Sequence, residues 1–211
     1  TGRLHPEART VIDIGGEDSK LVVLRRDEAT GRVGVADFAM NTMCAAGTGS
    51  FLDQQASRLG LSIEDFGKLA LESEHPPRVA GRCSVFAKSD MIHLQQKATP
   101  TRDIVAGLCF ALVRNFRSTV GSAAEMTPPV SFQGGVAANP GIVRAMKAVL
   151  ELSDDELIIP EHFYAMGAIG AALYAAAQDG PPAPDLSAEA LQTLEEFEVE
   201  TSRGTLPPLT I

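Results

Sequence analysis

The sequence predicts an α/β fold in which a mixed sheet is flanked by helices. Three observations carry this prediction. β-rich segments open the chain, the middle of the chain has helical periodicity throughout, and strand and helix patterns alternate near the end of the compact part. The expected order is therefore three strands, several helices, and then strand, helix, strand, helix.

The opening strands are expected at 10–14, 20–25 and 32–41. A Gly-Gly turn joins the first two, and a Thr-Gly turn signal precedes the third, so we expect an antiparallel meander. Apolar residues at helical spacing then predict four helices, over 51–59 ended by Gly60, 62–71 with Ser62 at its start, 85–97 capped by Ser84, and from a Thr101 cap through Phe116.

The alternating part begins with an expected strand over 129–133, followed by a second Gly-Gly turn. Asn139 and Pro140 suit the cap and first position of the next helix. The sequence ELIIP predicts a short last strand, and an alanine-rich helix is expected over 164–177. We expect one domain over 1–178 and, over 179–211, a proline-rich acidic linker or docking tail with one candidate helix at 187–196.

The amino-acid composition of the chain excludes some classes of binding partner. Apolar residues make up 45% of 211 residues, enough for a real core, and the net charge of -9 argues against nucleic acid. No apolar run is long enough to cross a membrane, so no membrane partner is expected. With only 3 cysteines a disulfide framework is not expected, which favours reduced thiols and a cytoplasmic location. The chain begins at Thr1, which suggests a piece of a longer protein.

The two Gly-Gly turns share one arrangement, because each follows an apolar strand, in DIGGEDSK at 13–20 and in GGVAAN at 134–139. Glycines permit positive φ and leave no Cβ in the way, so consecutive amides can cradle a phosphate. Asp13 can hold a magnesium ion through water. The alternative is an ordinary hairpin turn in the first case and a packing requirement in the second.

Cys44 and Cys83 each lie just ahead of a predicted helix, where the partial positive charge of the helix start stabilises a thiolate. Their spacing alone leaves three roles open: buried structural cysteines, ligands, or a redox disulfide pair. Cys109 lies inside an apolar helix and is expected to be a packing residue.

Five segments together resemble the ATPase family of 2-hydroxyacyl-CoA dehydratase activators and benzoyl-CoA reductase ATPase subunits, the BadF/BadG/BcrA/BcrD family. The segments, spread over residues 10–177, are VIDIGGEDSK, CAAGTGSFLD, GRCSVFAKSD, FQGGVAANPG and MGAIGAALYA. The resemblance implies an RNase-H-like half of an actin, Hsp70 and sugar-kinase type ATPase. The first phosphate loop of such ATPases has no counterpart in this sequence, so we expect the carboxyl-terminal half of the ATPase. Activity is expected of the intact parent protein and little or none of this piece alone.

The resemblance also implies site residues. DIGG corresponds to the second phosphate loop and GGVAAN to the adenosine motif, so the implied ATP/ADP-binding residues are Gly15, Gly16, Gly134, Gly135, Val136 and Asn139. Asp13, with Mg, and Glu17 are the implied catalytic residues. The family usually has glutamine where this sequence has Glu17. A carboxylate can polarise water but also repels the γ-phosphate, which leaves the hydrolytic role of Glu17 open.

For the cysteines, the resemblance implies that Cys44 and Cys83 bind a 4Fe-4S cluster. Such a cluster takes four thiolates, so a second copy in a homodimer, or a paired activase unit in the parent chain, would supply the other two. The implied function is ATP-driven, low-potential electron transfer to a dehydratase or aryl-CoA reductase component.

Two rival functions stay open. A sugar kinase of the same superfamily would need a sugar-binding carboxylate and has no use for paired cysteines. A non-catalytic dimerisation or docking module of a larger activase would bind nucleotide without turnover.

Overall fold

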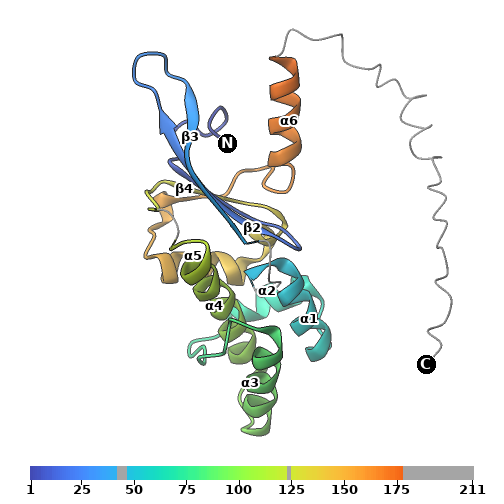
Figure 1. Cartoon of the computed structure of the whole chain (residues 1–211). Helices are drawn as coiled ribbons and strands as arrows, with labels where there is room; N and C mark the ends of the chain where they lie inside the picture. Colours follow the sequence, from blue (N-terminus) through green and yellow to red (C-terminus); the bar gives the residue numbers. More distant parts are fainter. Residues whose placement is uncertain (42–46, 123–124, 178–211) are drawn as a thin grey trace, which may run out of the picture. The chain divides into compact units, whose positions relative to one another are not determined.

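The computed structural model describes residues 1–41, 47–122 and 125–177. Within them the strands and helices follow the expected order (Figure 1). The strands are β1 (Thr10–Ile14), β2 (Ser19–Arg26), β3 (Val33–Asn41), β4 (Val130–Gln133) and β5 (Leu157–Ile158). The α-helices are α1 (Gly49–Leu59), α2 (Ile63–Leu71), α3 (Ser84–Gln96), α4 (Thr101–Thr119), α5 (Pro140–Leu150) and α6 (Met166–Ala176).

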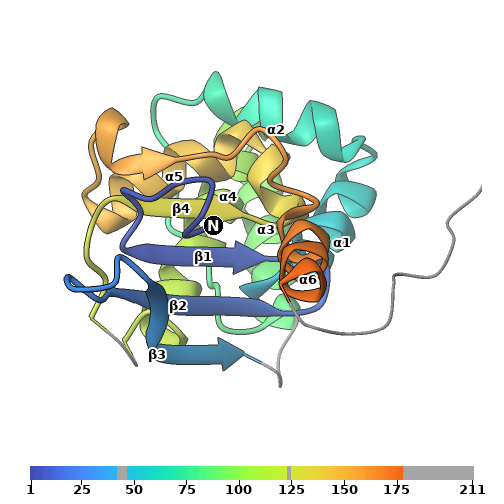
Figure 2. The same ribbon diagram turned by 90° about the horizontal axis from the view of Figure 1, so that it is seen from above.

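All five strands form one mixed sheet in the order β3-β2-β1-β4-β5 (Figure 2). β1, β2 and β3 are the expected antiparallel meander, whereas β4 runs parallel to β1 and β5 parallel to β4. In the parallel pair Asp13 is opposite Gln133. The carboxyl ends of β1 and β4 therefore meet at one edge of the sheet, and both Gly-Gly turns leave from that edge. The predicted fold class is confirmed.

Helices α1 to α5 lie on one side of the sheet, as Figures 1 and 2 both show. The core between these layers is built on α4, whose residues are buried at most positions from Ile104 to Phe116. From the sheet, Ile12, Leu21 and Phe132 are fully buried against these helices. Burying one such side chain contributes about 1.5–3 kcal/mol, so this layer contact holds the sheet edge and its turns in place.

Of the four expected helix caps, two are confirmed and two are wrong. The Ser62 side chain accepts a hydrogen bond from the Asp65 amide, and Asn139 caps α5 with Pro140 at its first position. However, α3 begins one residue earlier than expected, with Cys83 rather than Ser84 as N-cap. α4 likewise includes Thr101, which was the expected cap.

The backbone accounts for both differences. Cys83 is extended, with φ -151° and ψ 133°, so the turn into the helix falls at Cys83. Pro100 is the N-cap of α4, and its φ of -54° is already close to the helical value. In neither case does a side chain make the capping hydrogen bond. Backbone conformation, rather than the nearest hydroxyl, sets these two boundaries.

The last part of the chain is only partly described. Thr1–Ala172 forms one compact unit, and the end of α6 belongs to a second unit that begins at Leu173. The expected helix at 187–196 and the tail over 179–211 lie outside the described residues and stay predictions. No helix within the described ranges combines the length and the hydropathy needed to cross a membrane.

Candidate functional site

The first glycine turn connects β1 to β2 and is closed by a backbone hydrogen bond of 3.0 Å from the Gly15 amide to the Asp18 carbonyl. Asp18 also accepts a 2.8 Å bond from the Lys20 ammonium. Glu17 is exposed at the tip of the turn and makes no hydrogen bond or ion pair with a described residue. Its carboxylate is therefore free to face a ligand or solvent.

The glycines of this turn do not have positive φ, contrary to the expectation from sequence, and a Cβ on Gly16 would meet no other atom within 4 Å. In the described chain, positive φ at glycine occurs only at Gly31, Gly60 and Gly134. Instead, the start of α1 lies directly on the turn. The Gly49 amide donates to the Gly15 carbonyl at 2.8 Å, and a Cβ on Gly49 would lie 3.3 Å from the Gly16 Cα.

Ser50 adds to this contact. Its amide donates to the Gly16 carbonyl at 2.8 Å, and its hydroxyl donates to the same oxygen at 2.6 Å. Both carbonyls of the glycine pair thus point at the first turn of α1, which fixes the turn in one position. The free amides at the start of a helix are satisfied here by protein rather than by water.

The second glycine turn requires glycine for both of the expected reasons. Gly134 has a φ of 88°, and a Cβ there would overlap the Ile14 carbonyl oxygen and lie 2.8 Å from Asp13 Oδ1. The two turns therefore touch each other. Gly135, by contrast, has open space on the side where a Cβ would point, and begins the 3₁₀ turn η2 (Gly135–Ala138).

Asp13 is held beside both turns. Its Oδ2 accepts a 2.8 Å hydrogen bond from Gln133 Nε2, and Gln133 Oε1 accepts a 2.7 Å bond from the Thr1 hydroxyl. The second carboxylate oxygen lies toward Gly134. A half-buried carboxylate fixed in this way can bind a hydrated divalent cation without a large ordering cost.

The side-chain amide of Asn139 has hydrogen-bond partners for its oxygen but none for its nitrogen. Its Oδ1 accepts from the amides of Gly141 at 3.0 Å and Ile142 at 3.2 Å, which fixes the side chain as the cap of α5. Its Nδ2 is buried and has no hydrogen-bond partner. Because a buried donor without a partner costs about 1–3 kcal/mol, this nitrogen points to a ligand acceptor.

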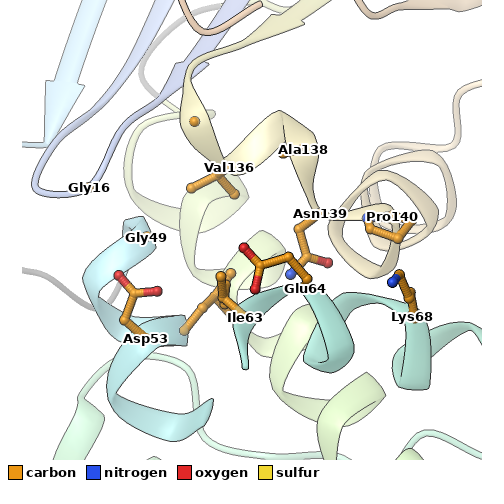
Figure 3. A pocket seen from close by; sticks show the side chains of 12 residues that line it. Gly16, Gly49, Asp53, Ile63, Glu64, Lys68, Val136, Ala138, Asn139 and Pro140 are labelled. Carbon is orange, nitrogen blue, oxygen red and sulfur yellow. The ribbon is translucent and has the colours of Figure 1, made fainter. Parts of the chain in front are cut away.

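A cavity of about 630 Å³ joins these features. Figure 3 shows the first glycine turn at one end and Pro140 at the other. The cavity is lined by Gly16, Gly49, Leu52, Asp53, Ile63, Glu64, Lys68, Gly135, Val136, Ala138, Asn139 and Pro140. Its apolar lining with a few polar groups, and its size, are typical of a site for a small organic ligand.

The sequence motifs predict one wall of this cavity but not the other. Gly16, Gly135, Val136 and Asn139 were expected, whereas the residues contributed by α1 and α2 were not. The signal available was a glycine inside a short helix: a Cβ on Gly67 would lie 2.8 Å from Pro140 Cδ and 2.9 Å from Asn139 Oδ1. Only close packing of α2 on the second turn explains a glycine there.

The cysteines differ from one another. Cys83 is partly exposed at the start of α3, and its thiol makes no capping hydrogen bond, so the sulfur is available as a ligand. Cys109 is fully buried, and this burial raises the pKa of its thiol to about 12. Cys109 is thus confirmed as a packing residue. Cys44 lies outside the described residues, and among the described ones no three His, Cys, Asp or Glu side chains form a metal site.

Comparison with known proteins finds a matching family model and similar proteins of the same family. Residues 2–175 match the model of the BadF/BadG/BcrA/BcrD ATPase family. The 2-hydroxyisocaproyl-CoA dehydratase activator of Clostridioides difficile is 40% identical over 171 residues, which cover 81% of this chain and 60% of that protein. The chain thus spans about three fifths of the length of this relative.

Two solved structures share the fold. Component A of the Acidaminococcus fermentans (R)-2-hydroxyglutaryl-CoA dehydratase superposes with a TM-score of 0.74 at 32% identity, covering 82% of this chain and 63% of that one. The activator of the 2-hydroxyisocaproyl-CoA dehydratase from Clostridium difficile, solved with bound ADPNP, gives a TM-score of 0.71 at 35% identity, covering 92% and 65%.

Proposed function

This chain belongs to the BadF/BadG/BcrA/BcrD ATPase family, and on that premise we propose that it is the nucleotide- and cluster-binding part of an ATP-dependent iron-sulfur activator. Its role is to drive low-potential electron transfer to a partner of the 2-hydroxyacyl-CoA dehydratase or aryl-CoA reductase type. The observation that carries the proposal is the contact between the two glycine turns beside a cavity with an unsatisfied donor, Asn139 Nδ2.

Adenosine nucleotide is the proposed ligand of the cavity. The phosphates would lie at Gly15 and Gly16 and the nucleoside along Gly134, Gly135, Val136 and Asn139. Four of these six residues, Gly16, Gly135, Val136 and Asn139, line the cavity, whereas Gly15 and Gly134 do not. The bound ADPNP in the Clostridium difficile activator supports this assignment. Asp13 would hold the magnesium ion through water, and Glu17, at the free tip of the turn, would orient the attacking water.

The proposed 4Fe-4S cluster has Cys44 and Cys83 as ligands. Cys83 fits this role, because its sulfur is accessible and the amides of the first turn of α3 lie beside it. Cys109 does not fit, since its thiol is buried and stays protonated. A cluster of this type takes four thiolates, so a second copy of the chain, or a paired activase unit, supplies the remaining two. Reduced thiols of this kind fit a cytoplasmic location.

When bound, the cluster supplies one-electron chemistry. The contribution of this chain is to hold the nucleotide and to link it to the cysteine segments. Because Gly49 and Ser50 of α1 hydrogen-bond the first glycine turn, a movement of that turn on nucleotide binding moves the helix that follows Cys44 in sequence. The contacts to the nucleotide and the segment that carries Cys44 would therefore move together.

The similar proteins support a partner for this chain and bear on the two alternative functions. Those named above are activators or components of 2-hydroxyacyl-CoA dehydratases, which supports a dehydratase partner. None of the proteins named above is a sugar kinase. The non-catalytic module differs from the proposal only in turnover, and ATP hydrolysis by the intact parent protein separates the two.

Anaerobic reconstitution with iron and sulfide tests the cluster assignment. We expect a broad visible absorption band that is lost in Cys83→Ala and retained in Cys109→Ala. A band that survives the loss of both Cys44 and Cys83 would contradict the assignment.

A further inference from the structure

The chain reaches α3 through residues 77–82, a segment that we call the strap and that lies directly on the core helix α4. A Cβ on Gly107 of α4 would lie 2.6 Å from the Pro77 carbonyl oxygen. A Cβ on Gly81 would overlap the carbonyl oxygen of Ala111, one turn further along α4. The backbone of the strap is therefore packed against the backbone of α4.

Two charged side chains hold one peptide group of the strap from both sides. The carbonyl of Val79 accepts a 3.2 Å hydrogen bond from Nη2 of Arg114, which belongs to α4. The amide of Ala80 donates a 2.8 Å hydrogen bond to Oδ2 of Asp90, which belongs to α3. Both groups are part of the planar peptide bond between Val79 and Ala80, so a guanidinium and a carboxylate together fix one peptide plane. We call this arrangement the clamp.

The packing of α3 by itself does little to fix the direction of this helix. Of its 13 residues, all of them described, just Ala87 and Met91 are buried. Val85 and Phe86, in its first turn, are each 64% exposed. A helix is usually held in place by an apolar face that packs against the core. Because Asp90 lies on α3 while its partner amide precedes the helix, the clamp joins the strap, α3 and α4.

Cys83 lies between the two parts of α3 and the strap that the clamp connects. It is the N-cap of α3 and follows Ala80 by three residues. Its carbonyl accepts a 3.0 Å hydrogen bond from the Ala87 amide, and its thiol makes no capping hydrogen bond. The position of the sulfur is therefore set by the backbone before and after Cys83, and the clamp orients that backbone.

We propose that Asp90 and Arg114 are positioning residues for Cys83, an inference that rests on the proposed cluster. By fixing the peptide plane between residues 79 and 80, they hold the Cys83 sulfur in one place before the cluster binds. A metal site depends on supporting residues that keep its ligands in the productive geometry. Neither side chain is itself a ligand in this proposal.

Glu74 is the matched control. It carries the same charge as Asp90 and lies three residues before the strap, but it is exposed and makes no hydrogen bond or ion pair with a described residue. Glu74→Ala therefore removes an acidic side chain close to the strap and leaves the clamp intact. Asp90→Asn is the conservative variant, because its amide oxygen can still accept from the Ala80 amide.

Hydrogen exchange at the Ala80 amide of the purified protein tests the clamp without reference to a cluster. Loss of a hydrogen bond to a charged group costs about tenfold or more, so Asp90→Ala should speed this exchange at least about tenfold. Asp90→Asn should speed it roughly two- to threefold, because a neutral acceptor is weaker. Glu74→Ala should leave it unchanged. Arg114→Ala should also speed it, and the double variant should gain less than the product of the two single effects.

Electron paramagnetic resonance of the reduced, anaerobically reconstituted protein tests the positioning of Cys83. We expect one set of g-values in the wild type, and shifted or heterogeneous g-values in Asp90→Ala and in Arg114→Ala. Asp90→Asn and Glu74→Ala should give the wild-type spectrum. A residue that only stabilised the fold would lower the unfolding midpoint and leave the spectrum of the folded variant unchanged. If Asp90→Ala does not fold, Arg114→Ala and Asp90→Asn carry the test.

The outcomes separate this inference from the proposed function. If exchange at Ala80 is unchanged in Asp90→Ala, or rises equally in Glu74→Ala, the clamp is overturned. If exchange rises but the spectra of Asp90→Ala and Arg114→Ala match that of the wild type, the positioning role is overturned while the proposed cluster stands. If the wild type takes up no cluster, the proposed function and this inference are both overturned.

Discussion

The amide of Gly49 donates a 2.8 Å hydrogen bond to the carbonyl of Gly15, which joins the start of α1 to the turn that follows β1. In sequence, Gly49 comes five residues after Cys44. One short stretch of chain therefore separates a proposed cluster ligand from a direct contact with the proposed phosphate turn. This relation gives the coupling between nucleotide and cluster a physical basis in named atoms.

Gly134 and Gly135 form a matched pair for testing the contact of the two turns. Gly134→Ala should destabilise the protein by about 2 kcal/mol or more, since positive φ costs about 1–2 kcal/mol and the added methyl overlaps the Ile14 carbonyl. Gly135→Ala should change stability by less than about 1 kcal/mol, because space is open there. Chemical denaturation measures both, and equal losses would contradict the close contact.

Asn139 has two roles that substitutions can separate: its Oδ1 caps α5, and its Nδ2 is proposed to donate to the nucleotide. Asn139→Asp keeps the acceptor that caps α5 but places a carboxylate oxygen at the buried position of Nδ2, so it should lower the free energy of unfolding, though by less than Asn139→Ala does. The same change removes the buried Nδ2 donor, so ADP should bind at least about tenfold more weakly. Asn139→Ala should lose both. Unchanged ADP affinity in Asn139→Asp, measured by calorimetry, would show that Nδ2 does not face the nucleotide.

Glu17 is exposed at the tip of the first turn, where its charge would face the γ-phosphate. Glu17→Gln removes a like-charge repulsion that solvent screens, so we expect ATP to bind about two- to fivefold more tightly relative to ADP. The ratio of the two dissociation constants is the measurement. Glu28→Gln, a change in an exposed residue that does not line the nucleotide cavity, is the control. A ratio that is unaltered by Glu17→Gln would place Glu17 away from the γ-phosphate.

Cys109 should impose a pH dependence on stability. Burial raises the pKa of its thiol from 9.0 to about 12, so above pH 9 the unfolded chain loses this proton while the folded chain keeps it. The unfolded state then binds fewer protons, and the stability contributed by the neutral thiol falls as pH rises from about 9 toward 12. Cys109→Ala should be less stable at neutral pH and should show a shallower decline over this range. An equally steep decline in the variant would contradict the assignment.

Local signals in the sequence were sufficient for much of this fold. The meander, the strand before the second turn and the Asn139 cap each depend on neighbouring residues, and each was predicted. The residues on α1 and α2 that line the cavity could not be predicted in this way. Their position depends on how closely α2 packs against Pro140 and Asn139, a long-range contact that a lone glycine at position 67 does not specify.

The residues of the candidate site also include some that the local sequence predicts and some that it does not. Glycine pairs after strands are a local signal, and the structure brings both pairs together at one sheet edge because β1 and β4 are adjacent and parallel. The reason for the first pair was nevertheless misjudged. Its glycines have ordinary φ values, and what makes the close contact with α1 there is Gly49. The role of Cys44 stays a prediction, because that residue lies outside the described part of the chain.

The central claim is that nucleotide and cluster are linked in one protein, and electron paramagnetic resonance of the reduced, anaerobically reconstituted protein tests it most directly. Spectra are recorded without nucleotide, with saturating ADP and with saturating ATP. We expect an iron-sulfur signal that changes between the ADP and ATP samples and is lost in Cys83→Ala. An iron-sulfur signal that is identical in all three samples, or no signal in a protein that binds ATP, would contradict the account.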